Sequence, residues 1–422
     1  MKPEKVTLNN KLRVVNNQMP SVQSATSMIL VRSGSRYEEK KTNGIAHFAE
    51  HMFFKGTKKR PSTLDISSLI DGVGGEFNAF TSKEFTGYYI KAAKEHLQLC
   101  LDVVSDMLLN SIFAQEEINR ERNVIAEEIR MYLDTPMRYI GDIYEMLLFG
   151  DQPLGWDTAG TLESLKNIER RDFFKYIEDF YTPSNMVVVI SGGVDPERAN
   201  LFVDEYMGAI KDKKAKGFLP VTLSQSKPMV KTFFKGSEQA HLCLGVRSYE
   251  RGHKDRYKIA LLSTILGGSM SSRLFIQLRE RRGLAYYVRA GVEEYHDAGS
   301  LAAQAGVEPK NIEEAAKVIL QEYSDIAQNP PSEVELRRAK EYIKGKMILD
   351  LEDSREVGNI FGLQEILEGK IRSTEEIFKE VEKVTAKDIQ SVAKDIFVNQ
   401  GLNLAVIGPY KESSKFEKIL RF

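Results

Sequence analysis

Residues 43–57 read NGIAHFAEHMFFKGT, and they place two of the six histidines of the 422-residue chain four positions apart, with a carboxylate between them. The apolar residues of this stretch recur at helical spacing, which predicts a helix with Asn43 as its N-cap. In a helix, residues four apart share one face, and a residue three along lies beside them. His47, Glu50 and His51 are therefore expected to converge on one spot.

Two imidazoles placed in this way can hold Zn²⁺, with the glutamate close enough to act as a general base on water at the metal. The alternative is a solvated helix face that carries these residues by chance. Six histidines in 422 residues rarely produce such a pattern, and Ile45, Phe48, Met52 and Phe53 give the helix an apolar face. We therefore predict a metal site.

A catalytic zinc takes a third protein ligand and keeps one position open. The segment ERNVIAEEIRM, residues 121–131, offers the best donors. Glu121 and Glu128 are seven residues apart and share a helix face, whereas Glu127 points elsewhere. The third ligand is therefore expected from this segment.

The second half of the chain repeats the first with a period of about 215 residues, far beyond a solenoid repeat. Val31-Arg32-Ser33 aligns with Val246-Arg247-Ser248, and EVELRRAKEYIKGK lies on EEINRERNVIAEEI without a gap. In that alignment Glu121 falls on Arg338 and Glu128 on Gly345, and the stretch opposite HFAEH has no His or Glu. One copy therefore carries the whole metal set and the other carries none of it.

The duplication predicts an α+β protein of two homologous α/β-sandwich-type domains, each a mostly antiparallel sheet packed with helices. The expected N-terminal zinc-bearing domain covers residues 1–212. A polar, aperiodic linker follows at residues 213–228. The C-terminal domain, residues 229–422, is expected to have a similar fold without the zinc motif.

Composition limits the partners. The formal net charge of −1 gives no overall field toward nucleic acid or an anionic membrane. There is no apolar run long enough to span a bilayer, and the first residues do not resemble a targeting leader. Cys100 and Cys243 lie far apart without a CxxC motif, which excludes a disulfide scaffold and suits a reducing compartment. We expect a cytoplasmic protein with neither nucleic-acid nor membrane partners.

The chain carries, in sequence order, the motifs HFAEH, GGEFNAFTSKEFTGYY, ERNVIAEE and GGSMSSRLFIQLRERRGLAYYV. In these motifs the chain resembles the pitrilysin/insulinase family of zinc peptidases, whose metal motif reverses the common H-E-x-x-H order. The likeness covers nearly the whole chain. Within the family it is similar to the short bacterial members and the β-subunit of the mitochondrial processing peptidase. The resemblance implies a processing-peptidase-like fold and zinc-dependent endopeptidase activity on peptides or unfolded polypeptides.

The resemblance also implies roles for particular residues. His47, His51 and Glu128 become the ligands of one Zn²⁺ per chain. Glu50 becomes the general base, and Glu121 a carboxylate near the site.

Substrate contacts follow from the same resemblance. The edge strand that pairs with the peptide backbone by strand addition would be formed by Asn78, Ala79, Phe80 and Thr81. Arg279 and Tyr286 match a pair that contacts the substrate carbonyl and stabilises the developing oxyanion. Taken alone, the segment would be an ordinary strand, Arg279 a surface charge and Tyr286 a core aromatic.

Two rival functions are weighed against the peptidase. The first rival is a non-catalytic scaffold or assembly subunit, because the family contains inactive partners. The second is a zinc hydrolase of non-peptide substrates, which the edge-strand segment disfavours. Single-chain relatives contain four such domains around a chamber. The resemblance therefore implies a homodimer with active sites shared between chains, in which Arg279 and Tyr286 face the zinc site of the other copy.

Overall fold

A computed structural model describes residues 2–422, and their contacts divide the chain into two compact units. The first unit consists of Met1–Arg130, Trp156–Leu219 and Met347–Glu375, and the second of Met131–Gly155, Pro220–Lys346 and Glu376–Phe422. Each unit thus combines segments from both halves of the sequence. The domain boundary expected at residues 213–228 concerns the duplicated sequence and stays a prediction.

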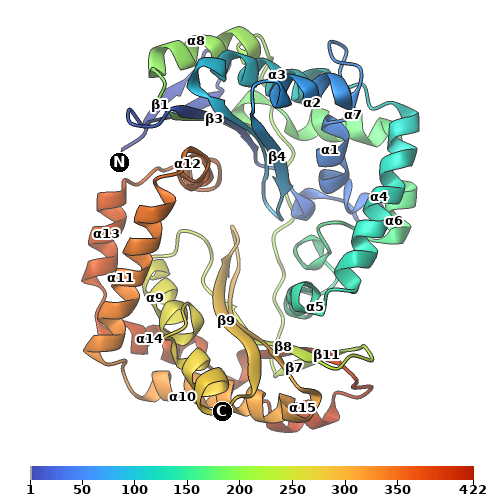
Figure 1. Cartoon of the computed structure of the whole chain (residues 1–422). Helices are drawn as coiled ribbons and strands as arrows, with labels where there is room; N and C mark the ends of the chain where they lie inside the picture. Colours follow the sequence, from blue (N-terminus) through green and yellow to red (C-terminus); the bar gives the residue numbers. More distant parts are fainter. Residues whose placement is uncertain (1) are drawn as a thin grey trace. The chain divides into compact units, whose positions relative to one another are not determined.

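The first unit is built on a six-stranded sheet in the order β1-β2-β6-β3-β5-β4 (Figure 1). Its strands are β1 (Glu4–Thr7), β2 (Arg13–Gln18), β3 (Ser24–Val31), β4 (Glu76–Thr81), β5 (Thr86–Ala93) and β6 (Met186–Gly192). Neighbouring strands run antiparallel except β2 and β6, which are parallel. β6 and the second half of β3 are almost continuously apolar, and both strands are buried along nearly their whole length.

Helices cover both faces of this sheet. The helices of this unit are α1 (Ile45–Phe53), α2 (Thr63–Asp71), α3 (Leu97–Asn110), α4 (Gln115–Leu133), α6 (Leu162–Asn167), α7 (Arg170–Phe180), α8 (Pro196–Met207) and α12 (Ser354–Glu368), and of these α1, α2, α3, α8 and α12 contact its strands. Met28, Leu30 and Val189 pack against α12, whereas α3 contacts β3 and β5. A Cβ at Gly362 of α12 would lie 2.6 Å from Leu30 Cδ1, so glycine permits this close approach of helix and sheet.

The second unit repeats the arrangement, with a five-stranded sheet in the order β7-β11-β8-β10-β9. Its strands are β7 (Met229–Phe234), β8 (Ala240–Ser248), β9 (Ala285–Glu294), β10 (Gly299–Val307) and β11 (Leu402–Gly408). The order matches β2-β6-β3-β5-β4, and β7 runs parallel to β11 as β2 does to β6. The expectation of two α/β-sandwich domains of similar fold is confirmed.

The remaining helices belong mainly to this second unit. They are α5 (Pro136–Phe149), α9 (Arg256–Gly267), the π-helical segment η6 (Phe275–Arg281), α10 (Ile312–Gln328), α11 (Glu333–Asp350), α13 (Thr374–Lys383), α14 (Ala386–Ile396) and α15 (Ser414–Ile419). Two core clusters hold them to the sheet, one of them formed around α5.

One helix of each half is exchanged. α5 follows α4 in the first half of the sequence, yet it packs on β8 and β11 of the second sheet (Figure 1). Its counterpart α12 follows α11 in the second half and packs on β3 and β6 of the first sheet. Each unit is thus completed by a helix from the other half of the sequence.

Among residues 2–422, none of the helices combines the length and the apolar composition needed to cross a lipid bilayer.

Candidate metal centre

Helices α1 and α4 of the first unit bring three possible metal ligands together. Glu128 Oε2 lies 3.7 Å from His47 Nε2 and 3.5 Å from His51 Nε2. One donor atom from each of these residues lies within 4.8 Å of the other two, and each side chain is partly exposed. Within the part of the chain that the structure describes, no other group of three His, Cys, Asp or Glu side chains meets so closely.

This donor set suits zinc. Zinc is bound by His nitrogen and carboxylate oxygen at about 2.0–2.2 Å in a tetrahedral site, which sets ligand atoms roughly 3.4 Å apart. The two distances from Glu128 Oε2 are close to that spacing. Three protein ligands leave a fourth position open, as catalytic zinc sites require.

A second carboxylate orients one of the imidazoles. Glu121 on α4 is 4% exposed, and its Oε2 lies 3.2 Å from His51 Nδ1. Its other oxygen, Oε1, pairs with Lys55 Nζ at 2.6 Å. A proton on Nδ1, donated to Glu121, leaves Nε2 of His51 able to bind a metal. Lys55 was not predicted from the sequence, although it follows His51 by four residues, just beyond the end of α1.

The carboxylates also act on the charge of His51. Burial lowers its pKa, but the hydrogen bonds to Glu121 and Glu128 outweigh burial and raise the pKa to about 9. Burial raises the pKa of Glu121, and the hydrogen bonds from His51 and Lys55 outweigh it and lower that pKa. A pocket whose oxygens favour a proton on His51 also favours a divalent cation in its place.

Glu50 lies on the same helix without joining the ligand group. Its Oε2 accepts a hydrogen bond from Thr81 Oγ1, at the end of β4. Burial raises the pKa of Glu50, and the hydrogen bond from Thr81 only partly offsets the rise. A carboxylate with a raised pKa, held next to a metal site, is suited to accept a proton from water.

The four residues of the expected substrate strand lie in β4. β4 is the edge of the first sheet and pairs with β5 alone, with Ala79 opposite Tyr88 and Thr81 opposite Thr86. Asn78 is exposed, and Ala79, Phe80 and Thr81 are half-buried. An edge strand presents backbone N–H and C=O groups that can pair with another chain.

The N-terminal end of α1 is held by a residue that sequence reasoning missed. The buried Glu38 carboxylate accepts hydrogen bonds from the backbone N–H groups of Gly44 at 2.7 Å and Ala46 at 2.8 Å. The expectation that Asn43 caps the helix is wrong, because its side chain instead donates to Glu38 at 2.8 Å. The N-cap is Gly44, whose φ of 96° favours glycine.

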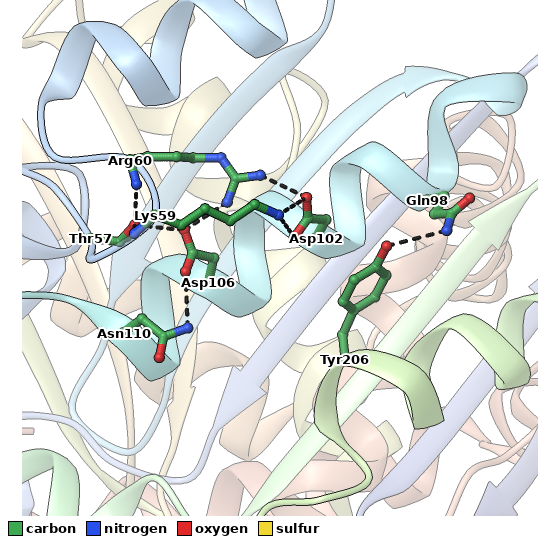
Figure 2. Close-up of polar contacts among 8 residues, drawn as sticks. All are labelled: Thr57, Lys59, Arg60, Gln98, Asp102, Asp106, Asn110 and Tyr206. Atoms are coloured by element: carbon green, nitrogen blue, oxygen red, sulfur yellow. Dashed lines mark hydrogen bonds and ion pairs between the residues drawn. The ribbon is translucent and has the colours of Figure 1, made fainter.

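Polar contacts, the most buried of them around Asp106, fix the chain just beyond α1 to α3 (Figure 2). Asp106 accepts hydrogen bonds from Thr57 Oγ1 and Arg60 Nη1, each at 2.6 Å, and from Asn110 Nδ2 at 2.9 Å. Arg60 Nη2 also pairs with Asp102 at 2.7 Å. The helix that carries both histidines is therefore anchored at its two ends.

Arg279 and Tyr286 belong to the second unit. Arg279 lies in η6, with its guanidinium carbon 5.1 Å from the centre of the Phe275 ring. Tyr286 lies in the edge strand β9 and is 52% exposed, so the alternative of a core aromatic does not hold. At the positions aligned with Glu121 and Glu128, helix α11 carries Arg338 and Gly345.

Two α/β-sandwich domains, the first of which carries a His-His-Glu centre, are typical of a class of metallopeptidases. Comparison with known families supports this class. Residues 13–161 match the model described as insulinase (peptidase family M16), and residues 167–343 match the peptidase M16 inactive domain. The chain belongs to the insulinase, or peptidase M16, family.

Curated relatives cover nearly the whole chain. An uncharacterized zinc protease, YmxG, from Bacillus subtilis is 35% identical over 96% of this chain and 98% of that protein. An uncharacterized zinc protease from Streptomyces coelicolor is 36% identical over 97% of this chain and 90% of its own length.

Solved structures share the fold. A protease from Helicobacter pylori superposes with a TM-score of 0.90 at 24% identity, over 96% of this chain and 99% of that one. A chain of complex III2 from Candida albicans superposes with a TM-score of 0.83 at 16% identity, over 99% of this chain and 100% of that chain. At these identities the likeness concerns the fold alone.

Proposed function

We propose that this protein is a zinc metalloendopeptidase. The observation that carries the proposal is the meeting of His47, His51 and Glu128 beside Glu50, which is itself bonded to the edge strand β4. Membership of a peptidase family and relatives named zinc proteases support it. The three ligand residues would hold one Zn²⁺ per chain.

Each residue has a separate task in hydrolysis. Zinc, when bound, acts as a Lewis acid and makes water a stronger nucleophile. Glu50 takes the proton from the attacking water and passes it to the departing amine. Thr81 holds the Glu50 carboxylate in place, and Glu121 holds the imidazole of His51. Arg279 and Tyr286 would stabilise the negative charge that develops on the peptide carbonyl oxygen.

The substrate class follows from β4. A peptide that adds to a sheet edge is held by its backbone, so recognition requires an extended segment rather than a particular sequence. Asn78, Ala79, Phe80 and Thr81 would form this platform, and Thr81 links it to Glu50. Peptides and unfolded polypeptides are therefore the proposed substrates, and compact folded domains are not.

A non-catalytic scaffold is the second candidate. It is favoured by the match of residues 167–343 to a domain described as inactive. That match covers the half that lacks the metal set, whereas the ligand group lies within the stretch matched to the insulinase model. A pure scaffold has no physical reason to keep His47, Glu50, His51 and Glu128 in this arrangement.

A cleavage assay distinguishes the two functions. Purified protein is incubated with a mixed peptide library, an unfolded protein and a compact folded protein, with and without a chelator. We expect cleavage of the peptides and the unfolded protein alone, loss of cleavage with the chelator and recovery on adding Zn²⁺. Zinc-loaded protein that cuts none of the library would favour the scaffold, and efficient cleavage of the folded protein would contradict backbone recognition.

The assembly proposal rests on the family resemblance. We propose a homodimer in which the ligands, Glu50 and β4 of one chain act with Arg279 and Tyr286 of the other. We also propose a cytoplasmic location, which the two free, buried cysteines support.

A further inference from the structure

A cavity of about 430 Å³ in the first unit is lined mainly by cationic side chains. The lining residues are Gln115, Arg122, Lys166, Ile168, Glu169, Arg170 and Arg171. They come from the beginnings of α4 and α7, the body of α4 and the end of α6. Four of the seven carry a positive charge and one a negative charge, so the cavity has a strong local excess of positive charge in a nearly neutral protein.

The protein neutralises little of this charge. Glu169 pairs with Arg171 at 3.1 Å, and both side chains are well exposed. Within residues 2–422, Arg122, Lys166 and Arg170 form no ion pair with a carboxylate. Like charges gathered without counterions repel one another, and a bound anion relieves that repulsion.

The two central guanidinium groups are held in fixed orientations by neutral acceptors. Arg122 donates to the backbone oxygens of Leu165 at 3.0 Å and Ile168 at 2.7 Å, and to the amide oxygen of Asn119 at 3.1 Å. Arg170 donates to the backbone oxygens of Phe113 at 2.8 Å and Ile112 at 2.9 Å. These bonds position each cation without cancelling its charge. Each guanidinium has five N–H groups, so donors remain for a ligand.

We propose that this cavity binds a small anion with a chain of two or three phosphates, such as an inorganic polyphosphate or the phosphate tail of a nucleotide. Several fixed cations around one cavity match the several charges of such a chain, and guanidinium groups bind phosphate oxygens in pairs. The cavity is larger than a single phosphate needs.

Calorimetric titration of the full chain with inorganic pyrophosphate tests the proposal. We expect binding at low salt that weakens as sodium chloride is added, because exposed charges are screened. The double variant Lys166→Gln/Arg171→Gln removes two exposed charges and should weaken binding at least tenfold. The control Lys254→Gln/Lys387→Gln removes two exposed lysines elsewhere and should leave the affinity unchanged. Any heat from pyrophosphate acting on bound zinc is common to all three proteins.

Inorganic triphosphate and a nucleoside triphosphate separate the two sources of the phosphate chain. Equal affinities, both lost in the cavity variant, support recognition of the phosphates alone. Tighter binding of the nucleotide, lost in the same variant, supports a nucleotide as the ligand. Absence of binding by all three anions, or equal affinity in the wild type and the cavity variant, would overturn the proposal.

Discussion

Thr81 Oγ1, at the end of the edge strand, donates a hydrogen bond to Glu50 Oε2 on the helix that carries both histidines. This bond joins the strand proposed to hold the substrate to the carboxylate proposed to move the proton. The position of the base therefore depends on the strand that the substrate would extend.

Replacing Thr81 tests that link. Thr81→Val keeps the shape of the side chain and removes the donor. A hydrogen bond to a charged group contributes about 1.5–3 kcal/mol, so kcat/KM should fall roughly ten- to hundredfold. Thr81→Ser retains the donor and should keep most of the activity. Equal kcat/KM for Thr81→Val and the wild type would show that the bond has no part in turnover.

The ligand set predicts an ordered series of zinc affinities. His51→Ala and Glu128→Gln each remove a proposed ligand and should lose zinc during purification. Glu121→Gln removes no ligand but disturbs the orientation of His51 and the ion pair with Lys55, and it should weaken zinc affinity about 10- to 100-fold. Glu127→Gln is the matched control, since Glu127 is exposed and pairs with Arg130. Zinc content measured by elemental analysis should rank the variants in this order, and a loss in Glu127→Gln equal to that in Glu128→Gln would refute the assignment.

Glu38 predicts a pH dependence of stability. Burial raises its pKa from 4.5 to about 7, although its N–H partners and Lys83 lower it. The folded state therefore binds a proton more tightly than the unfolded state does. The resulting stabilisation is complete below pH 4.5 and is lost as the pH rises through 7, by about 3 kcal/mol at most.

Glu38→Ala should remove that slope. It should also lower stability by about 1–2 kcal/mol at pH 5, because the first turn of α1 loses its cap. Denaturant unfolding at pH 5 and pH 8 measures both effects. A wild type whose unfolding free energy changes between these pH values no more than that of the variant would contradict the role assigned to Glu38.

Sequence reasoning worked where spacing along one element decides the geometry. His47 and His51 are four residues apart, and Glu121 and Glu128 are seven apart. Helical periodicity alone therefore predicts that each pair shares one helix face. The need for a third ligand led to the expectation that α1 and α4 face each other. In the structure, Glu128 Oε2 lies within 3.7 Å of the Nε2 atoms of both imidazoles. The similar fold of the two domains was likewise expected from the duplication, and the matching strand orders confirm it.

What could not be predicted depends on contacts without a periodic signal. Glu38 reaches α1 from outside the helix, and Asn43 matches the usual N-cap pattern better, so no capping pattern marks Glu38. The exchange of α5 and α12 is a choice between two sheets that share a five-strand order. The sequence around Gly362 does not indicate that this helix packs on β3 rather than on β8.

The homodimer proposal is tested by mixing two inactive proteins. One carries Glu50→Gln and the other Arg279→Ala with Tyr286→Phe. If the sites are shared between chains, a mixed dimer contains one site with all groups intact and one with both sets altered. Peptide cleavage should therefore recover, with one active site of the two in each mixed dimer. No recovery, despite proven subunit exchange, would place all the groups in one chain.

The zinc content and turnover of Glu50→Gln, measured on the same sample, test the central claim most directly. Glu50 is proposed as a base and not as a ligand, so the variant should fold, keep about one zinc per chain and lose peptide cleavage by several orders of magnitude. Wild-type protein prepared in parallel supplies the reference for both values. Turnover near the wild-type level in the zinc-loaded variant, or loss of the metal from a folded variant, would contradict the account.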